Sequence, residues 1–249
     1  MAEREHLTRI IGRSNEIEVA GSALRELQNG LGSLLMFSGE PGIGKSTLVR
    51  RVARDATAAG LPVYWGFSWE AGGAPAYWPW TQLLQSMNKA NDAVPCPGLY
   101  PILSGDDETD EAAALDPDQA RFRLLESVRS YLVSVSERSP MLLVLEDLHA
   151  ADAESLRLLQ HIARHIAAMP ILLVGTFREL EARRQPAMDA LWRAARDAVR
   201  VRVSRFDAGD IRDFLEMGGK ETVTTEQVNR LLDTTSGNPL FLAELMGFM

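Results

Sequence analysis

The chain has 249 residues, 46% of them hydrophobic, which is enough to bury one large core, or one core with a small satellite. Its formal net charge of −8 disfavours direct nucleic-acid binding, which needs a positive field. The one cysteine, Cys96, excludes an internal disulfide and a cysteine-based zinc site, and we interpret it as a loop thiol without a role. No apolar run reaches the roughly 20 residues of a membrane span and no signal core is present, so we expect a cytoplasmic protein without membrane contact.

Apolar runs bounded by turns alternate with amphipathic segments along most of the chain. In chain order, the patterns predict a helix over 17–28, a strand over 34–37, a helix over 45–58, a strand over 62–67, a helix over 121–134, a strand over 141–145, a helix from a cap at Asp152 to a break at Pro170, a strand over 171–174, a helix over 189–197 and a strand over 199–203. This alternation predicts an α/β fold with a five-stranded, mainly parallel sheet covered by helices. After residue 205 only helices are predicted, over 209–217, 225–234 and from 240 onward. We therefore divide the chain into an α/β core (1–205) and a small helical lid (206–249).

Two segments between these elements have unusual compositions. Residues 104–119 are acidic and rich in turn formers, which predicts a solvated loop. Four of the five tryptophans fall between Trp65 and Trp80. Core packing beside the second strand explains them most simply, and an interaction surface is the alternative.

The strongest motif follows the first predicted strand. Residues 39–46 read Gly-Glu-Pro-Gly-Ile-Gly-Lys-Ser and match the phosphate-loop pattern G-x-x-x-x-G-K-[ST] without a mismatch. The glycines let the backbone approach phosphates, successive N–H groups form an anion cradle, and the helix that follows directs its positive end at the same charge. Lys45 is predicted to reach the β- and γ-phosphates, and the Ser46 hydroxyl to bind Mg²⁺. The predicted nucleotide contacts are Gly39, Pro41, Gly42, Ile43, Gly44, Lys45, Ser46 and Thr47.

A second motif ends the third predicted strand. Four apolar residues lead into Glu146 and Asp147, at the sheet edge where ligands of such folds bind. One carboxylate can hold Mg²⁺ and the other can orient or deprotonate the attacking water. Position favours Glu146 for the metal and Asp147 for the water, but the order is the reverse of the common Asp-Glu pair, so both residues stay candidates for both roles. His149 is a weaker candidate for the site.

His161 and His165 are spaced as zinc ligands on a helix can be. The residues between them include no glutamate, and the sequence shows no third ligand. From the sequence alone we therefore infer no metal site here.

Five segments in this order resemble the signal-transduction ATPases with numerous domains (STAND), a class of P-loop NTPases. They are Ile11-Gly12-Arg13-Ser14-Asn15-Glu16, the phosphate loop, the stretch from Glu146 to Asp152, Val174-Gly175-Thr176-Phe177-Arg178, and Ser236-Gly237-Asn238-Pro239-Leu240-Phe241-Leu242. The likeness is greatest to the ATPase module of large LuxR-type regulators and related multidomain sensors. It departs from that pattern at Ala150, where a tryptophan is typical.

The resemblance assigns further residues. It implies that Ile11, Gly12 and Arg13 lie against adenine, that Arg178 senses the γ-phosphate as a catalytic residue beside Lys45, Glu146 and Asp147, and that Pro239 contacts the nucleotide from the lid. It also implies ATP or ADP with Mg²⁺ as cofactors. Family members usually continue into effector or sensor domains, so we expect these in the same polypeptide or in a partner protein; a minimal, self-contained protein is the alternative.

The function expected from this resemblance is a regulatory nucleotide switch with slow ATP hydrolysis, acting in signal transduction or transcription regulation. One alternative is an AAA-plus-like loader or remodelling ATPase, which predicts an oligomer that forms on ATP. The other is a nucleotide-binding module without turnover, although the acidic pair argues against it. Only the resemblance favours ATP over GTP.

Overall fold

The computed structural model describes residues 10–71, 73–90, 97–99, 116–184, 188–219 and 222–247. Within them one sheet contains β1 (Ser33–Ser38), β2 (Val63–Phe67), β3 (Met141–Glu146), β4 (Ile171–Phe177) and β5 (Val199–Arg202). The strand order is β2-β3-β4-β1-β5, and every neighbouring pair is parallel. The predicted five-stranded parallel sheet is confirmed. The order also sets the carboxyl end of β4 between those of β1 and β3, where the two motifs lie.

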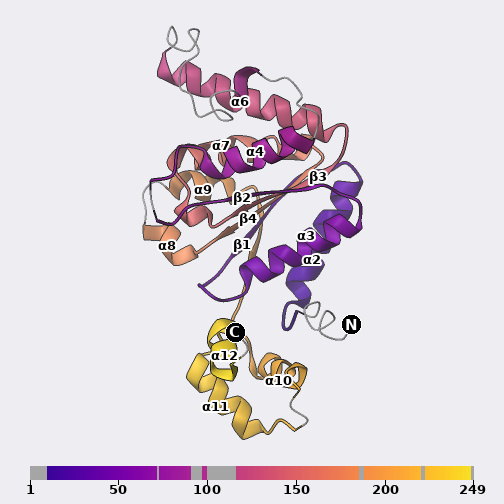
Figure 1. The fold of residues 1–249 in the computed structure, drawn as a ribbon, viewed down its shortest axis with the longest axis vertical. Coiled ribbons are helices and arrows are strands. Elements are labelled where there is room, and N and C mark those ends of the chain that lie inside the picture. Colours follow the sequence, from indigo (N-terminus) through magenta and orange to yellow (C-terminus); the bar gives the residue numbers. More distant parts are fainter. Residues whose placement is uncertain are drawn as a thin grey trace.

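Helices cover both faces of this sheet (Figure 1). Helices α2 (Ser14–Gln28) and α3 (Lys45–Ala58) lie on one face. On the other face lie α4 (Trp78–Ala90), α7 (Ala153–Ala163) and α9 (Asp189–Ala194), with α6 (Pro117–Ser136) packed outside them. The short helix α8 (Glu179–Arg184) follows β4 directly.

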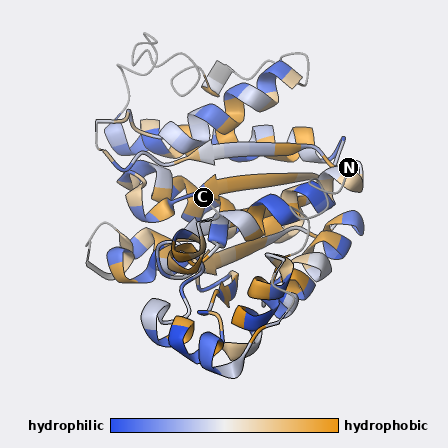
Figure 2. Ribbon diagram, turned by 60° about the horizontal axis from the view of Figure 1, so that its bottom comes forward, coloured by the Kyte–Doolittle hydropathy of each residue, from blue (hydrophilic) through white to orange (hydrophobic). Residues whose placement is uncertain are grey.

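The strands are apolar throughout because each one supplies two cores. Leu34 and Met36 of β1 pack with the α4, α6, α7 and α9 side, whereas Leu35 and Phe37 pack with α2 and α3. Successive side chains of a strand point to opposite faces, so a strand covered on both sides needs an unbroken apolar run. Figure 2 shows these hydrophobic strands enclosed by helices with hydrophilic outer faces.

The structure corrects the sequence prediction at one helix boundary and adds one helix that it lacks. Helix α6 begins at Pro117, inside the segment 104–119 that was predicted to be a loop; proline at the first helical position loses no hydrogen bond and has the required φ. Residues 104–115, and Cys96, lie outside the described residues. Helix α4 was not predicted at all, although its buried residues recur at helical spacing: Trp80, Leu83, Leu84 and Met87.

Helix α7 also ends earlier than the predicted break at Pro170. It stops at Ala163, and a 3-10 turn (Ile166–Ala168) follows. This tighter turn brings Ile166 and Met169 into the core, where both are buried. The predicted cap is confirmed, because the Asp152 carboxylate accepts a hydrogen bond from the backbone N–H of Ser155 at 2.8 Å.

The tryptophan-rich segment is divided between the core and the surface. Trp80 is fully buried and its indole N–H donates to the carbonyl of Ser155 at 3.0 Å. Trp69 is 57% exposed. Trp65 stacks on Phe67 with ring centroids 5.8 Å apart on β2, an edge strand of the sheet.

The last three helices form a separate group below the sheet (Figure 1). They are α10 (Ala208–Met217), α11 (Thr225–Thr235) and α12 (Pro239–Met246). Their small core contains Phe206, Ile211, Leu215, Val228 and Leu242, and Ile11 from the start of the described chain packs into it. Among the described residues, no helix has the length and apolar character to span a membrane.

Candidate functional site

The glycine-rich turn 39–46 joins β1 to α3. Gly42 and Gly44 have φ of +72° and +100°, a conformation that side chains disfavour. Lys45 begins α3 and is buried, and its ammonium group donates to the carbonyls of Gly39 at 3.1 Å and Glu40 at 2.9 Å. Burial, and secondly the charge of Arg178, lower the pKa of Lys45. An anion close to this ammonium group would offset that effect.

The next residue connects the turn to the third strand. The Ser46 hydroxyl donates to a carboxylate oxygen of Glu146 at 2.5 Å. Glu146 is buried at the end of β3, and desolvation raises its pKa while the Ser46 hydrogen bond opposes that rise. The structure thus brings together two of the three predicted metal ligands. Two adjacent oxygens of this kind suit Mg²⁺, which prefers hard oxygen ligands.

Asp147, the next residue, makes different contacts. Its φ of +58° is left-handed, and its backbone N–H donates to the Thr176 hydroxyl of β4 at 2.9 Å. Its partly exposed carboxylate lies 3.9 Å from Nδ1 of His149. Glu146 therefore contacts Ser46, whereas Asp147 is bonded to β4 through its backbone and lies near His149.

Arg178, just after β4, lies in a cluster of charges that the sequence did not reveal. Its guanidinium group contacts Glu70 at 2.7 Å and Glu181 at 3.1 Å. His149 is buried below them, with Nε2 3.3 Å from Glu70 and 3.2 Å from Glu181, but neither ring nitrogen has hydrogen-bond geometry. Burial and then the Arg178 charge lower the pKa of His149.

The segment Ile11–Arg13 lies between the phosphate loop and α10. Arg13 is buried; its guanidinium group donates to the carbonyl of Ile43 at 3.0 Å and lies 5.0 Å from the ring centroid of Phe206. Gly12 has φ of +62°, and a Cβ there would meet the Asp210 carboxylate at 2.3 Å. Glycine at position 12 lets the backbone pass close to Asp210 of α10. The segment therefore packs tightly against the C-terminal helices.

Two contacts connect the phosphate loop to the C-terminal part of the chain, one from α12 and one from Arg205, which also donates to the carbonyl of Ser236 at 3.3 Å. The Asn238 side-chain amide donates to the carbonyl of Pro41 at 3.0 Å while its oxygen caps α12. Arg205 binds the Glu40 carboxylate through two nitrogens, at 2.7 and 3.0 Å. Pro239 is the first residue of α12.

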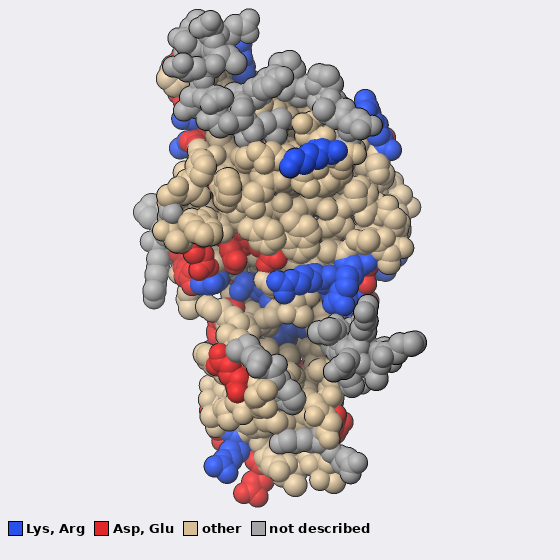
Figure 3. Space-filling model, in the orientation of Figure 1, with Lys and Arg blue, Asp and Glu red and all other residues tan. Residues whose placement is uncertain are grey.

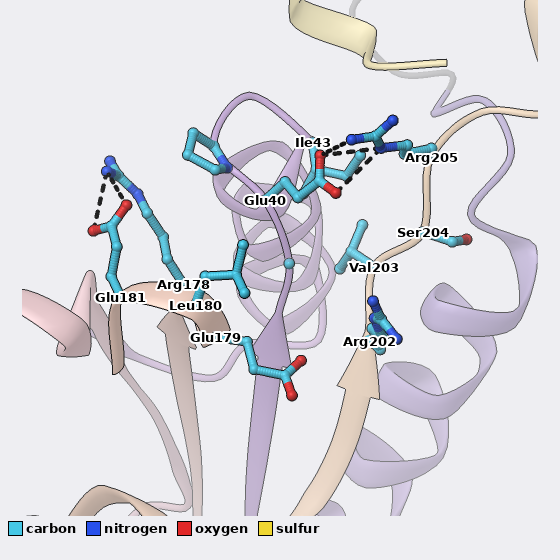
Figure 4. A pocket seen from close by; sticks show the side chains of 12 residues that line it. Glu40, Ile43, Arg178, Glu179, Leu180, Glu181, Arg202, Val203, Ser204 and Arg205 are labelled. Atoms are coloured by element: carbon cyan, nitrogen blue, oxygen red, sulfur yellow. Dashed lines mark hydrogen bonds and ion pairs between the residues drawn. The ribbon is translucent and has the colours of Figure 1, made fainter. Parts of the chain in front are cut away.

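A cavity of about 910 Å³ opens beside the phosphate loop. Residues of the phosphate loop, of the segment from Arg178 to Glu181 and of the segment from Arg202 to Arg205 form its lining; Figure 4 shows the Arg178–Glu181 and Glu40–Arg205 pairs on opposite sides. In Figure 3, charged side chains of both signs gather in the same region, at the waist above the C-terminal helices. The cavity is large enough for a nucleotide.

Sequence reasoning missed Glu70, Glu181, Glu40 and Arg205. No motif identifies Glu70 or Glu181. Glu40 is a variable position of the phosphate loop, and Arg205 ends a basic run that contains Arg200 and Arg202. That run, which begins within β5 and ends just after it, is the one available signal.

A family model described as an AAA ATPase domain matches residues 9–174. The chain belongs to this AAA ATPase domain family. The match begins just before the Ile11–Arg13 segment and ends in β4, so it includes the phosphate loop and the acidic pair. The expectation of a P-loop NTPase of the STAND or AAA type is thereby confirmed.

Relatives of this AAA ATPase domain are distant. An uncharacterized protein of Rhizobium meliloti (strain 1021) is 25% identical over 261 residues, covering 95% of this chain and 24% of that protein. The ORC2 protein of Aeropyrum pernix in its ADPNP-ADP complexes has a TM-score of 0.52 and 17% identity, covering 96% of this chain and 65% of that one. A STAND protein with a tetratricopeptide repeat sensor from Pyrococcus horikoshii has a TM-score of 0.50 and 17% identity, covering 94% of this chain and 29% of that one.

These structural likenesses show the fold of the AAA ATPase domain. The chain spans about a quarter of the length of the curated relative and about two thirds or less of the two solved structures.

Proposed function

We propose that this AAA ATPase domain binds ATP with Mg²⁺ in the cavity above the phosphate loop, hydrolyses it slowly, and acts as a regulatory switch of a larger signalling or transcription-regulatory assembly. The contact between Ser46 and Glu146 carries this proposal. It joins the hydroxyl expected at Mg²⁺ to a buried carboxylate at the end of β3. The Lys45 ammonium group is held by carbonyls of the same loop. The ADPNP-ADP complexes of the structurally similar ORC2 protein support an adenine nucleotide.

Each group has a distinct proposed role. The loop amides and Lys45 bind the β- and γ-phosphates, and Ser46 and Glu146 hold the Mg²⁺, which would neutralise phosphate charge. Asp147 orients or deprotonates the attacking water. Arg178 binds the γ-phosphate. Ile11, Gly12 and Pro239 lie around the base, and Arg13 holds the loop from behind, through Ile43.

The switch is proposed to work through residues 206–249, the helical lid. Asn238 of the lid binds Pro41, and Arg205, the last residue of the core, binds both Glu40 and the carbonyl of Ser236 in the lid. A nucleotide that reshapes the loop must therefore change these contacts or move the lid with it. Loss of the γ-phosphate would release Arg178 on one side of the cavity. The lid position would therefore differ between the ATP and ADP states.

The test is to identify the nucleotide that co-purifies with the protein, and to measure ATP and GTP binding and turnover for matched variants. We expect Lys45→Ala to lose nucleotide binding, and Asp147→Asn to bind ATP without turnover. Lys89→Ala and Asp233→Asn, at exposed positions of α4 and α11, serve as controls and should behave as wild type.

Unchanged hydrolysis in both site variants would disprove the assignment. ATP binding without any turnover in the wild type would favour a binding module. Assembly into a defined oligomer on ATP, measured by light scattering, would favour a loader or remodelling ATPase.

A further inference from the structure

A cluster of metal-ligating side chains lies on the outer helices, away from the phosphate loop. Glu126 comes from α6, His161 from α7, and His165 from the turn after α7. One ligand atom from each of the three lies within 4.8 Å of the other two. The shortest contact is 2.8 Å, between Nε2 of His161 and Oε1 of Glu126. Glu126 is the third ligand that the sequence could not identify, because it comes from a different helix.

The two histidines are held in register by the helix. Residues four apart lie on the same side of a helix, and Arg164 and His165 keep right-handed helical backbone beyond the end of α7. Their ring centroids are 5.3 Å apart. Two imidazoles bound to one tetrahedral zinc ion at about 2.0–2.1 Å would have centroids roughly 5 Å apart. The observed spacing therefore suits a shared ion without movement of the helix.

The carboxylate is also placed as a ligand. Nε of Arg129 donates to Oε2 of Glu126 at 2.9 Å, which leaves Oε1 directed at His161. Such an outer contact fixes the orientation of a metal-binding carboxylate. Nε2 of His161 lies 2.8 Å from this oxygen, so the imidazole and the carboxylate already face each other.

We propose that Glu126, His161 and His165 form a binding site for a divalent transition-metal ion, Zn²⁺ above all, which joins α6 to α7. Two imidazole nitrogens and one carboxylate oxygen are a common zinc ligand set, and a fourth position is left to water. His165 is exposed, so an ion can enter from solvent. The ion would connect α6 to α7, whose first residue is separated from the acidic pair by five residues.

In a second cluster, Glu70, Asp147 and His149 likewise have ligand atoms within 4.8 Å of one another. It is a poorer metal site, because the Glu70 oxygen that faces His149 is the same one that pairs with Arg178, and because His149 is buried. It adjoins the proposed nucleotide site, so metal binding there would be a property of that site. The experiment therefore has to separate the two clusters.

The experiment is titration of nucleotide-free, tag-free protein with Zn²⁺ by calorimetry, and with Co²⁺ by visible absorption. We expect one ion per chain and a tetrahedral Co²⁺ spectrum. His165→Gln and Glu126→Gln should each weaken binding at least tenfold, by the loss of one ligand. Glu70→Gln should bind as wild type. Zn²⁺ should raise the thermal unfolding midpoint of the wild type but not of His165→Gln.

His165 is exposed, so its substitution should leave the fold intact, and circular dichroism without metal checks this. Three results would overturn the proposal: no saturable binding by the wild type, wild-type affinity in His165→Gln, or binding lost in Glu70→Gln instead. Because all measurements omit nucleotide, failure here leaves the proposed ATPase function standing, and failure of that function leaves the metal site standing.

Discussion

Arg178 forms an ion pair with Glu70, and a distance of 2.7 Å separates the guanidinium nitrogen from the carboxylate oxygen. The two residues come from different parts of the sheet edge, since Arg178 follows β4 and Glu70 lies in the segment after β2. In this arrangement the Glu70 carboxylate is paired with the guanidinium group of Arg178, which we propose as the binding group for the γ-phosphate. Glu70 would therefore compete with ATP for Arg178, and ADP would leave the pair intact.

The first prediction is that Glu70→Gln raises the affinity for ATP relative to ADP. An ion pair at this half-exposed position contributes about 0.2–1 kcal/mol, so the affinity ratio should rise by roughly 1.4- to fivefold. Fluorescence titration with both nucleotides measures the ratio. In an Arg178→Ala background the same change should leave the ratio unaltered; an equal rise there would show that Glu70 acts through general charge and not through Arg178.

The second prediction concerns Gly42, where the phosphate loop meets α12. A Cβ at this position would lie 2.6 Å from Cβ of Leu240, whereas one at Gly60 would meet nothing within 4 Å. Both glycines have a positive φ, so both alanine substitutions add strain of about 1–2 kcal/mol. Gly42→Ala should cost about 1–3 kcal/mol more, because the lid must move. Urea unfolding without nucleotide compares the stabilities of the two variants. Equal losses of unfolding free energy would mean that α12 can move away from residue 42 at no measurable cost.

The sequence was sufficient for the sheet and the phosphate loop because both depend on local patterns. The apolar runs of β1, β3 and β4 follow from burial on both faces, and the turn 39–46 follows from its glycines. Helix α4 also has a local signal, in Trp80, Leu83, Leu84 and Met87, but the aromatic residues and Pro79 obscured it. Proline is tolerated in a first helical turn, which is where Pro79 lies.

Other features of the site depend on contacts between distant segments, which no local pattern records. Glu70 and Glu126 are ordinary charged residues until the fold sets them beside Arg178 and His161. The left-handed turn at Asp147 is likewise invisible, because it depends on the Thr176 hydroxyl of the neighbouring strand. Strand order therefore had to be known before the contacts of the acidic pair could be assigned.

The third prediction is that Arg13→Lys destabilises the nucleotide-free protein. The buried Arg13 fork donates to the Ile43 carbonyl and packs near the Phe206 ring, and a lysine ammonium group cannot reproduce both contacts. We expect a loss of about 1–3 kcal/mol in the free energy of unfolding. Arg25→Lys, at an exposed arginine that bonds Ser22, should change it by less than about 0.5 kcal/mol. Similar losses of unfolding free energy in both variants would contradict the proposal that Arg13 joins Ile43 to Phe206.

The last prediction is a dependence of stability on alkaline pH that comes from Tyr77. Its hydroxyl contacts Glu154 at 3.2 Å, and burial, followed by the charge of that carboxylate, raises the pKa of Tyr77. A raised pKa means that the folded state holds the phenolic proton more tightly than the unfolded state. This contribution is complete below the unfolded pKa of about 10 and is lost as the pH rises above it.

Wild-type stability should therefore fall above about pH 10 more steeply than that of Tyr77→Phe, by at most about 1.4 kcal/mol per pH unit for one proton. Below that pH the variant should be the less stable protein, by about 1 kcal/mol, because it loses the hydrogen bond to Glu154. Denaturant unfolding at pH 8, 10 and 11 measures both differences. Glu154→Gln provides a second check, since removal of the carboxylate should make the alkaline loss shallower; parallel curves for all three proteins would exclude Tyr77 as the source.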